Sequence, residues 1–405
     1  MAGYQGRRRA DRSVGHGHSH GHSHGPAPDL PINRGTRATV VALLVVLGLA
    51  VVGGLVALWP DHDRVERLAH SLEFAAPGTT FPHATVVRVG DCPSDPISTC
   101  PLVVKVDDGP RVTVQVSQAD AASGLGSGDR VQLQHRAGAS GSAAYSYFRT
   151  DRGTALWLLV GLFVLVVVAV ARLRGLLALV GLGVGMVVIL GWMLPGLLSG
   201  HPPLLVALVG SAAILYVVLY LAHGVSLRTS AALLGTVGGL AVTALLGLAS
   251  VGTAHLSGVA DEGGTMLSSV TGRIDFQGLM TCTIVIAGLG VLNDVTITQA
   301  SAVWELRAAS PTASRARLWA SAMRIGRDHI ASTIYTIVFA YAGTALTTLL
   351  VVELYDRPLL DLLGTEQIAE EVVRSLVSGI GLVLAVPLTT AVAALTVPGP
   401  SHDVA

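Results

Sequence analysis

The sequence predicts an all-α membrane bundle of about eight transmembrane helices, with a small extracytosolic β-rich, barrel-like domain between the first and second helices. Composition is the first reason: 51% of the 405 residues are hydrophobic and only 13% are charged, with a mean hydropathy of +0.62. Soluble domains carry about 25% charged residues. The second reason is a series of apolar runs near the length of about 20 residues that a bilayer requires. The third is a block of short alternating runs that follows the first of them.

Residues 1–37 form a polar tail that we expect to be disordered and cytoplasmic, because it offers little apolar surface to offset the loss of chain entropy. Five histidines alternate with glycine and serine there: His16, His18, His20, His22 and His24. Neutral imidazoles on a flexible chain can bind Zn, Ni or Cu, so weak divalent-metal binding is one interpretation. The spacing matches no structural zinc site, and a low-complexity tail with incidental metal affinity is the alternative. No other cofactor is expected.

Residues 38–59 predict the first transmembrane helix. The run 38–58 is uninterrupted and apolar, and Trp59 and Pro60 end it at the membrane interface. The run starts late in the chain and lacks a small-residue cleavage site, which favours a retained helix over a signal peptide.

Residues 60–152 predict the β-domain. Alternating apolar and polar residues, separated by turns rich in Gly, Pro, Asp and Ser, predict about five strands of a partly open barrel. These runs cover 83–89, 102–106, 111–116, 129–134 and 144–149.

Cys92 and Cys100 flank a short loop of this domain. A disulfide can close a loop of this length if the geometry permits, and an extracytosolic location favours it over two free thiols.

Residues 153–397 predict a seven-helix transmembrane bundle, with a cytoplasmic connector at 299–329 and a short cytoplasmic tail at 398–405. The apolar spans lie at 154–171, 175–194, 203–222, 230–250, 278–298, 330–352 and 372–395. Arginines concentrate in the N-terminal tail, at Arg172 and Arg174, at Arg228 and in the connector. Positively charged loops stay in the cytoplasm, so both termini are predicted inside the cell membrane and the β-domain outside.

Two of these spans carry polar or small residues at steps of three and four, which places them on one face of a helix. The first stripe is Thr283, Ala287, Gly290, Asp294, Thr298, Ser301 and Glu305. The second is Asp328, Ser332, Thr336, Phe339, Gly343 and Thr347. Helices with one polar stripe suit a bundle that encloses something polar, so we expect the stripes to face the interior.

Asp294 is the most informative residue of the first stripe. A carboxylate at the centre of a spanning helix costs on the order of 2.5–3.5 kcal/mol on insertion scales. Asn293 is adjacent, and candidate partners are Arg324, Arg327 and His329. The alternative to a coupling role is a structural ion pair or cap near the cytoplasmic interface.

The connector has two interpretations. Its arginines fit an amphipathic cytoplasmic helix that lies on lipid, with Leu318, Trp319, Met323 and Ile325 inserted. Glu305 and Asp328 fit better with the shared polar stripe.

The segments GLGVLNDVTITQASAVWEL (288–306) and GRDHIASTIYTIVFAYAGTAL (326–346), together with the order of elements, resemble the YibE/F-like family of bacterial multi-pass membrane proteins. The resemblance covers roughly 70–395 and excludes the histidine-rich tail. It implies an integral membrane protein of a kind often described as a permease.

No enzymatic activity is predicted, because the sequence has no HExxH motif, no P-loop and no second aspartate at the depth of Asp294. The net charge of zero and the single lysine give no indication of nucleic-acid binding. We expect a transporter or permease that moves an ion or small solute along a polar seam between transmembrane helices 6 and 7. The candidate coupling residues are Asn293, Asp294, Thr298, Ser301, Glu305, Asp328, Ser332 and Thr336.

The alternative is a membrane scaffold or sensor whose β-domain binds a protein partner. The lipid bilayer is the remaining expected partner, and nothing in the sequence sets the oligomeric state.

Overall fold

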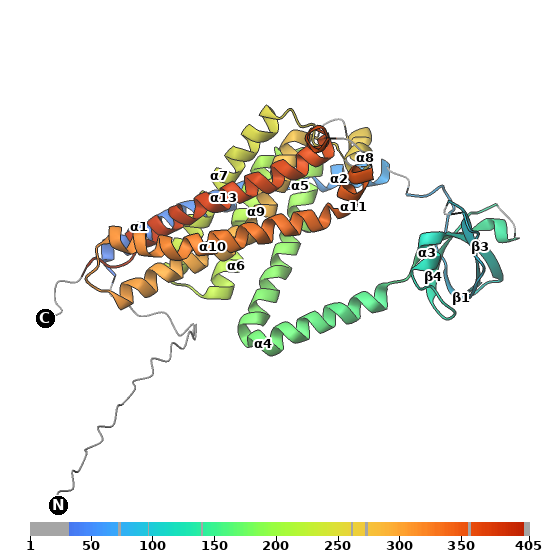
Figure 1. Cartoon of the computed structure of the whole chain (residues 1–405), viewed down its shortest axis with the longest axis horizontal. Coiled ribbons are helices and arrows are strands. Elements are labelled where there is room, and N and C mark those ends of the chain that lie inside the picture. Colours follow the sequence, from blue (N-terminus) through green and yellow to red (C-terminus); the bar gives the residue numbers. More distant parts are fainter. Residues whose placement is uncertain are drawn as a thin grey trace, which may run out of the picture.

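The computed structural model describes residues 32–71, 74–95, 97–138, 141–260, 262–271, 274–354 and 358–400. The five histidines of the tail, His16 to His24, lie outside the described residues. The described chain forms a helical bundle and a small β-domain, joined by one long helix (Figure 1).

The β-domain is a five-stranded antiparallel sheet with strand order β3-β2-β1-β4-β5, in which β3 and β5 approach each other so that the sheet nearly closes. Alternate residues face its core, as in β3, where Val112, Val114 and Val116 are buried and their neighbours are exposed. The prediction of about five strands is confirmed. The strands are β1 (His83–Val89), β2 (Thr99–Val106), β3 (Arg111–Ser117), β4 (Arg130–His135) and β5 (Tyr145–Thr150).

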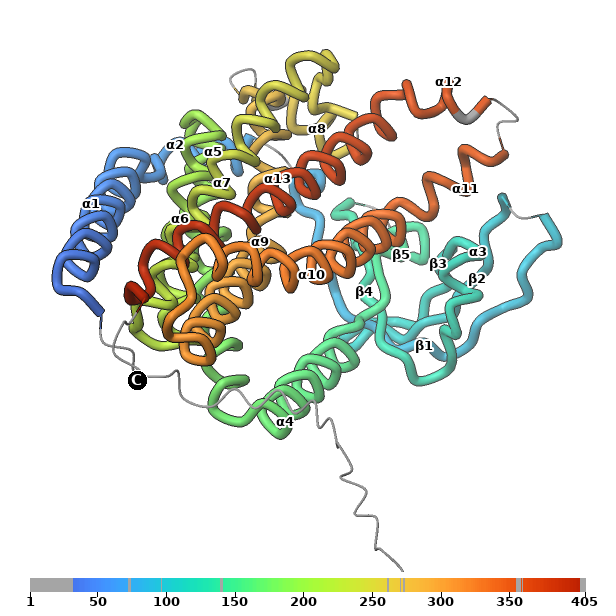
Figure 2. The backbone as a smooth tube through the Cα atoms, turned by 60° about the vertical axis from the view of Figure 1, so that its left-hand side comes forward, coloured from blue at the N-terminus to red at the C-terminus, as the bar shows by residue number. Residues whose placement is uncertain are grey.

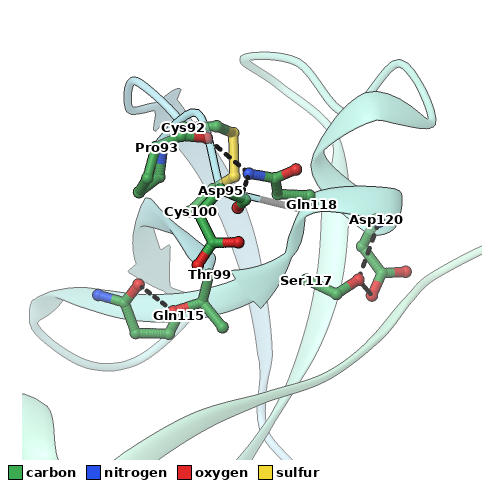
Figure 3. Close-up of a disulfide and its surroundings, with 9 residues drawn as sticks. All are labelled: Cys92, Pro93, Asp95, Thr99, Cys100, Gln115, Ser117, Gln118 and Asp120. Carbon is green, nitrogen blue, oxygen red and sulfur yellow. Dashed lines mark hydrogen bonds between the residues drawn. A yellow bond between two sulfur atoms is a disulfide. The ribbon is translucent and has the colours of Figure 1, made fainter. Parts of the chain in front are cut away.

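Cys92 and Cys100 form the predicted disulfide, which ties the loop before β2 to the strand itself (Figure 3). The side-chain amide of Gln118 donates hydrogen bonds to the carbonyls of Pro93 and Asp95, at 2.6 and 2.8 Å. The loop is therefore held from two sides, by the covalent bond and by a short helix, α3 (Gln118–Ala122).

The rest of the described chain is mostly helical. The short elements are α2 (His62–Ser71), the 3₁₀ turn η1 (Gly141–Ala144), the π-helical turn η2 (Ile189–Met193), α5 (Leu194–Leu198), α8 (Glu262–Val270), α11 (Leu346–Leu354) and α12 (Leu359–Leu363). The long helices are α1 (Arg34–Ala57), α4 (Gly153–Val188), α6 (Pro203–His223), α7 (Leu227–Thr253), α9 (Phe276–Ala309), α10 (Arg315–Thr344) and α13 (Glu366–Thr396).

Six helices of the described chain are long and apolar enough to cross a membrane, and a seventh is added if α10 and α11, which meet at a bend of 64°, form one span. The predicted spans at 154–171 and 175–194 lie on the two sides of a break in α4 at Arg172, whose φ of +53° and ψ of −135° are not helical, and the second span continues through η2 to the start of α5. The N-terminal half of α4 leaves the bundle and leads to the β-domain (Figure 1).

The predicted connector at 299–329 is mostly helical in the structure. Helix α9 continues to Ala309 and α10 begins at Arg315, with the Ser314 hydroxyl accepting a hydrogen bond from the Arg317 backbone N–H as its N-cap. Val303, Trp304 and Leu318 are buried against the bundle, which extends both helices beyond their apolar spans. Only residues 310–314 remain as a turn, so no separate surface helix exists here.

The centre of the bundle is the contact of α7, α9 and α13, which small residues allow to pack closely. A methyl group added to Gly235 or Gly381 would collide with the hydroxyls of Thr389 and Thr243 on the facing helix. Thr236 of α7 and Thr296 of α9 share a buried hydrogen bond of 2.6 Å between their hydroxyls. Close approach of this kind is typical of helices in membranes, where small residues and threonines form the interfaces.

We expect Gly381→Ala to lower the free energy of unfolding by about 1–3 kcal/mol, because the added methyl group overpacks a site that Thr243 already fills. The matched control is Gly379→Ala in the same helix, where nothing lies within 4 Å of the added group. That substitution should be neutral or stabilise by up to ~1 kcal/mol through helix propensity. Thermal unfolding of the purified protein in detergent measures both, and equal stability of the two variants would refute the packing argument.

Candidate functional site

The first predicted polar stripe does not face the interior of the chain. Thr283, Gly290, Asp294, Thr298 and Glu305 are exposed on α9, whereas Ala287 and Ser301 are partly buried. The opposite face of α9 is buried instead, and it carries Gly288, Leu292, Val295, Thr296 and Gln299 among others. The expected orientation is therefore corrected. Only one face of α9 can pack against α7 and α13. The face that carries Gly288 and Thr296 does so, and the predicted stripe is therefore turned away from these helices.

The second stripe is also turned outward. Asp328, Ser332 and Thr336 of α10 are exposed, and the hydroxyls of the last two donate to carbonyls of their own helix, at 2.9 and 3.3 Å. On α9, Thr298 and Ser301 do the same, with hydrogen bonds of 2.7 and 2.8 Å. These hydroxyls are satisfied within their helices, as is common for Ser and Thr in membrane helices. No contact that joins Glu305 or Asp328 to Asp294 occurs in the described part of the chain.

Helices α9 and α10 meet through other residues. The Gln299 side-chain amide donates a 2.9 Å hydrogen bond to the carbonyl of Ala322 on α10. Gly326 of α10 lies at the point where α9, α10 and α13 converge, since a methyl group there would meet Gln299 and Val386. This junction holds α10 beside α9. It thereby determines which side chains of α10 lie near Asp294.

Asp294 and His329 are the predicted site residues that the structure brings together. The Asp294 Oδ2 and His329 Nε2 atoms lie 4.0 Å apart, between two different long helices. The Asp294 side chain is 77% exposed and that of His329 is 33% exposed. At this distance the two groups are too far apart for a direct hydrogen bond, and they attract each other as ions only when the imidazole is protonated. The other two proposed partners, Arg324 and Arg327, make no ion pair with Asp294 in the described chain.

Two polar atoms at this site are buried without hydrogen-bond partners among the described residues. One is the Nε2 atom of His329 itself, and the other is the Oδ1 atom of Asn293, next to Asp294 in the chain. Buried polar atoms without partners are rare, and each calls for an explanation such as an ion, a water or a bound molecule. Asn293 and His329 therefore have hydrogen-bonding capacity that the described residues around them do not use.

More charged groups from other helices lie nearby. His223, at the end of α6, interacts electrostatically with Arg228, Arg174 and Asp294. Arg174 follows the kink of α4 and Arg228 begins α7, and the Nε of Arg228 is itself buried without a partner in the described chain. We call the set Arg174, His223, Arg228, Asp294 and His329 the polar cluster. It joins α4, α6, α7, α9 and α10 at one end of the bundle.

Sequence reasoning missed the polar residues that are buried between helices. Thr236, Thr296 and Gln299 are fully or almost fully buried, and so is Arg307, whose guanidinium donates to the carbonyls of Pro311 and Ala313 at the end of α9. The glycines and threonines that recur along α7 and α13 could have predicted which faces of these helices pack together.

Among the residues that the structure describes, no group of three or more His, Cys, Asp or Glu side chains could hold a metal ion.

The chain was compared with known proteins. A profile of the family described as YibE/F-like protein matches residues 159–399. Comparisons with curated proteins and with solved structures found no match. The matched segment holds the bundle from α4 to α13 and includes every residue of the polar cluster. Because the match covers more than half of the 405 residues, the chain belongs to the YibE/F-like protein family.

Proposed function

We propose that this membrane protein moves an ion or small solute across the cell membrane and that Asp294 and His329 are its proton-linked pair. The observation that carries the proposal is the 4.0 Å approach of these two side chains between two long helices, with buried polar atoms at His329 and Asn293 that no described residue satisfies. Ionisable groups within spanning helices usually mark ion pathways or proton relays. The proposed path follows the outward faces of α9 and α10 and not a seam enclosed between them.

The chemistry follows from the cost of charge in lipid. An isolated carboxylate at the centre of a spanning helix costs on the order of 2.5–3.5 kcal/mol, which protonation or an adjacent imidazolium reduces. Asp294 lies in the apolar span 278–298 of α9, close to the end of that span at which His223 ends α6 and Arg228 lies in the first turn of α7, so the cost at its position is smaller than at the centre. Binding of a cation between Asp294 and His329 would favour loss of the histidine proton, so proton release and cation binding are linked at this pair.

The same proposal includes eight spans. The helical stretch Gly153–Leu198 has 46 residues, which at about 1.5 Å per residue is about 69 Å, more than twice a bilayer core of about 30 Å. The kink at Arg172 divides it into two spans, and the bent pair α10 and α11 supplies one more. Eight spans and the distribution of arginines support cytoplasmic termini and an extracytosolic β-domain.

A second candidate function is a scaffold or sensor whose β-domain binds a protein. The observation that favours it is a cluster of Phe74, Phe81 and Phe148, whose ring centroids lie 4.9–5.8 Å apart. Phe74 is 77% exposed, and exposed aromatic groups of this kind often mark interaction sites. Crosslinking of the β-domain to a protein partner, without ion or solute flux, would favour this function.

We expect Asp294→Asn to abolish proton-driven flux, because asparagine keeps the size and hydrogen bonding of aspartate but cannot take up a proton. Stability should change by no more than about 1 kcal/mol, since the side chain is 77% exposed and such pairs contribute little. Proteoliposomes that carry a pH-sensitive dye, tested with a panel of ions and metals, measure flux. Asp361→Asn on α12 is the control for the same chemical change. Wild-type flux in Asp294→Asn would remove the proposed role.

We also expect Cys92 and Cys100 to react with membrane-impermeant thiol reagents on whole cells only after a reductant is added. The structure holds them in a disulfide, and the proposed topology places their domain outside. Labelling of both cysteines without a reductant would reject the disulfide. Labelling that requires permeabilised cells as well as a reductant would reject the orientation.

A further inference from the structure

Three phenylalanine rings form an aromatic cluster on the outside of the β-domain. Phe74 follows α2, Phe81 precedes β1, and Phe148 belongs to β5. Their ring centroids lie 4.9–5.8 Å apart. Tyr145 and Tyr147 of β5 pack against the core of the sheet, and the alternation of side chains along a strand leaves Phe148 on the outer face. Phe74 and Phe148 are exposed, so the described chain does not cover the aromatic cluster.

The side chain of Gln132, on β4, helps to fix this cluster. Its amide nitrogen donates a hydrogen bond to the Phe81 carbonyl at 3.1 Å, and its oxygen accepts one from the Arg149 Nε at 2.9 Å. The Arg149 guanidinium lies 5.9 Å from the centroid of the Phe148 ring, a distance at which a cation and an aromatic face attract each other. The segments that carry Phe81 and Phe148 are therefore held together within the β-domain.

The aromatic cluster lies at the end of the β-domain that adjoins α4 (Figure 1). Only two residues separate β5 from α4. One of them is Asp151, whose carboxylate lies 3.8 Å from the His83 imidazole, so the beginning of β1 is next to the beginning of α4. Phe148 precedes Gly153, the first residue of α4, by five residues, and a chain of that length spans at most about 18 Å.

Helix α2 connects the same cluster to the end of the bundle. The Ser199 hydroxyl, which follows α5, accepts a hydrogen bond from the Asp61 backbone N–H at 2.9 Å. The Ser199 carbonyl accepts one from the Arg64 guanidinium at 2.6 Å. The helix that precedes Phe74 is thereby attached to the turn between α5 and α6. Both chain connections of the aromatic cluster thus come from the ends of helices that are long and apolar enough to span a membrane.

These positions point to lipid as the partner of the aromatic cluster. All residues from 154 to 166 of α4 are exposed, and most of them are apolar, as expected for a helix that faces lipid. The aromatic cluster continues this apolar surface beyond the end of the helix. Arg149 and the exposed Arg152 lie between the Phe148 ring and α4 in the chain. Aromatic rings and long basic side chains both suit the membrane interface, where an apolar body contacts lipid and a charged end contacts water and phosphate.

We propose that the aromatic cluster inserts into the lipid surface beside the start of α4 and holds the β-domain against the membrane. The rings are assigned to lipid and not to the protein partner of the second candidate function. This anchor rests on the proposed span in the first half of α4. It does not depend on proton exchange at Asp294 and His329, or on the side of the membrane on which the β-domain lies.

The test is electron paramagnetic resonance of the full-length protein in nanodiscs of phosphatidylcholine and phosphatidylglycerol, with a nitroxide on Phe74→Cys. Only the introduced cysteine takes the label, because Cys92 and Cys100 form a disulfide and Cys282 is buried. Oxygen concentrates in lipid and a nickel chelate stays in water, so the ratio of their effects on nitroxide relaxation reports the depth of the label. We expect the ratio at position 74 to be shifted toward that of a label in lipid.

Two other label positions provide the references. Trp157→Cys places the label on the exposed surface of α4, where we expect a lipid value. Ile97→Cys is the matched control, because Ile97 is an apolar residue of the β-domain that is 91% exposed. It lies in the disulfide loop beyond Val89, and β1 separates Val89 from His83 by about 20 Å. We expect the value of a label in water there.

A second substitution tests whether the rings act together. Phe148→Ser, in the protein labelled at position 74, should shift the label toward water, because it removes apolar surface from the anchor. Ile97→Ser is the matched control and should leave the label where it is. Equal values in the two variants, with thermal stability unchanged in both, would refute the shared anchor.

Three outcomes of the labelling would overturn the proposal in different ways. A label at position 74 that is as exposed to water as the one at 97, with position 157 in lipid, would reject the anchor alone. Exposure of position 157 to water as well would reject the span of α4 on which the anchor rests. Exposure of position 74 to water in nanodiscs, together with protection in native membrane vesicles, would assign the rings to a protein partner.

Discussion

The arrangement of this bundle depends on the close contact of α7, α9 and α13. Glycines of α7 and α13 face threonines of the partner helix so tightly that a methyl group cannot be added at Gly235 or Gly381. Lipid supplies little hydrophobic force between helices, so dispersion contacts and hydroxyl hydrogen bonds, such as Thr236 to Thr296, hold the helices together. This contact occupies one face of α9 and thereby turns Asp294 away from the core.

Two polar places remain once that core is packed, and α10 takes part in both. Near the middle of α10, His329 approaches Asp294 among charged groups of three other helices. Near the C-terminal end of α10, Tyr341 and the bend after Thr344 border a cavity of about 540 Å³ that residues of α13 also line. Figure 2 shows α10 and α13 side by side. The ionisable side chains of both places lie outside the contact of α7, α9 and α13, in which threonines such as Thr236 and Thr296 are buried.

The sequence predicted features that depend on local pattern. Alternation predicted all five strands, and apolar runs predicted the long helices, because each follows from the residue type at a fixed period. The face of α9 that packs was not predictable in this way. Gly288 is buried and Gly290 is exposed, although both suit a helix contact, and only the partner helices decide between them. Inside the predicted connector, Val303, Trp304 and Leu318 are buried by contacts with other helices, which hydropathy does not register.

The proposed transport depends most directly on proton exchange at Asp294 while the protein is in a bilayer. Infrared difference spectroscopy of the protein in lipid, recorded between an acidic and an alkaline buffer, measures this through the C=O stretching band of protonated carboxyl groups. We predict a titrating band that disappears in Asp294→Asn and changes its pH dependence in His329→Gln. Identical difference spectra of the wild type and Asp294→Asn would contradict the account.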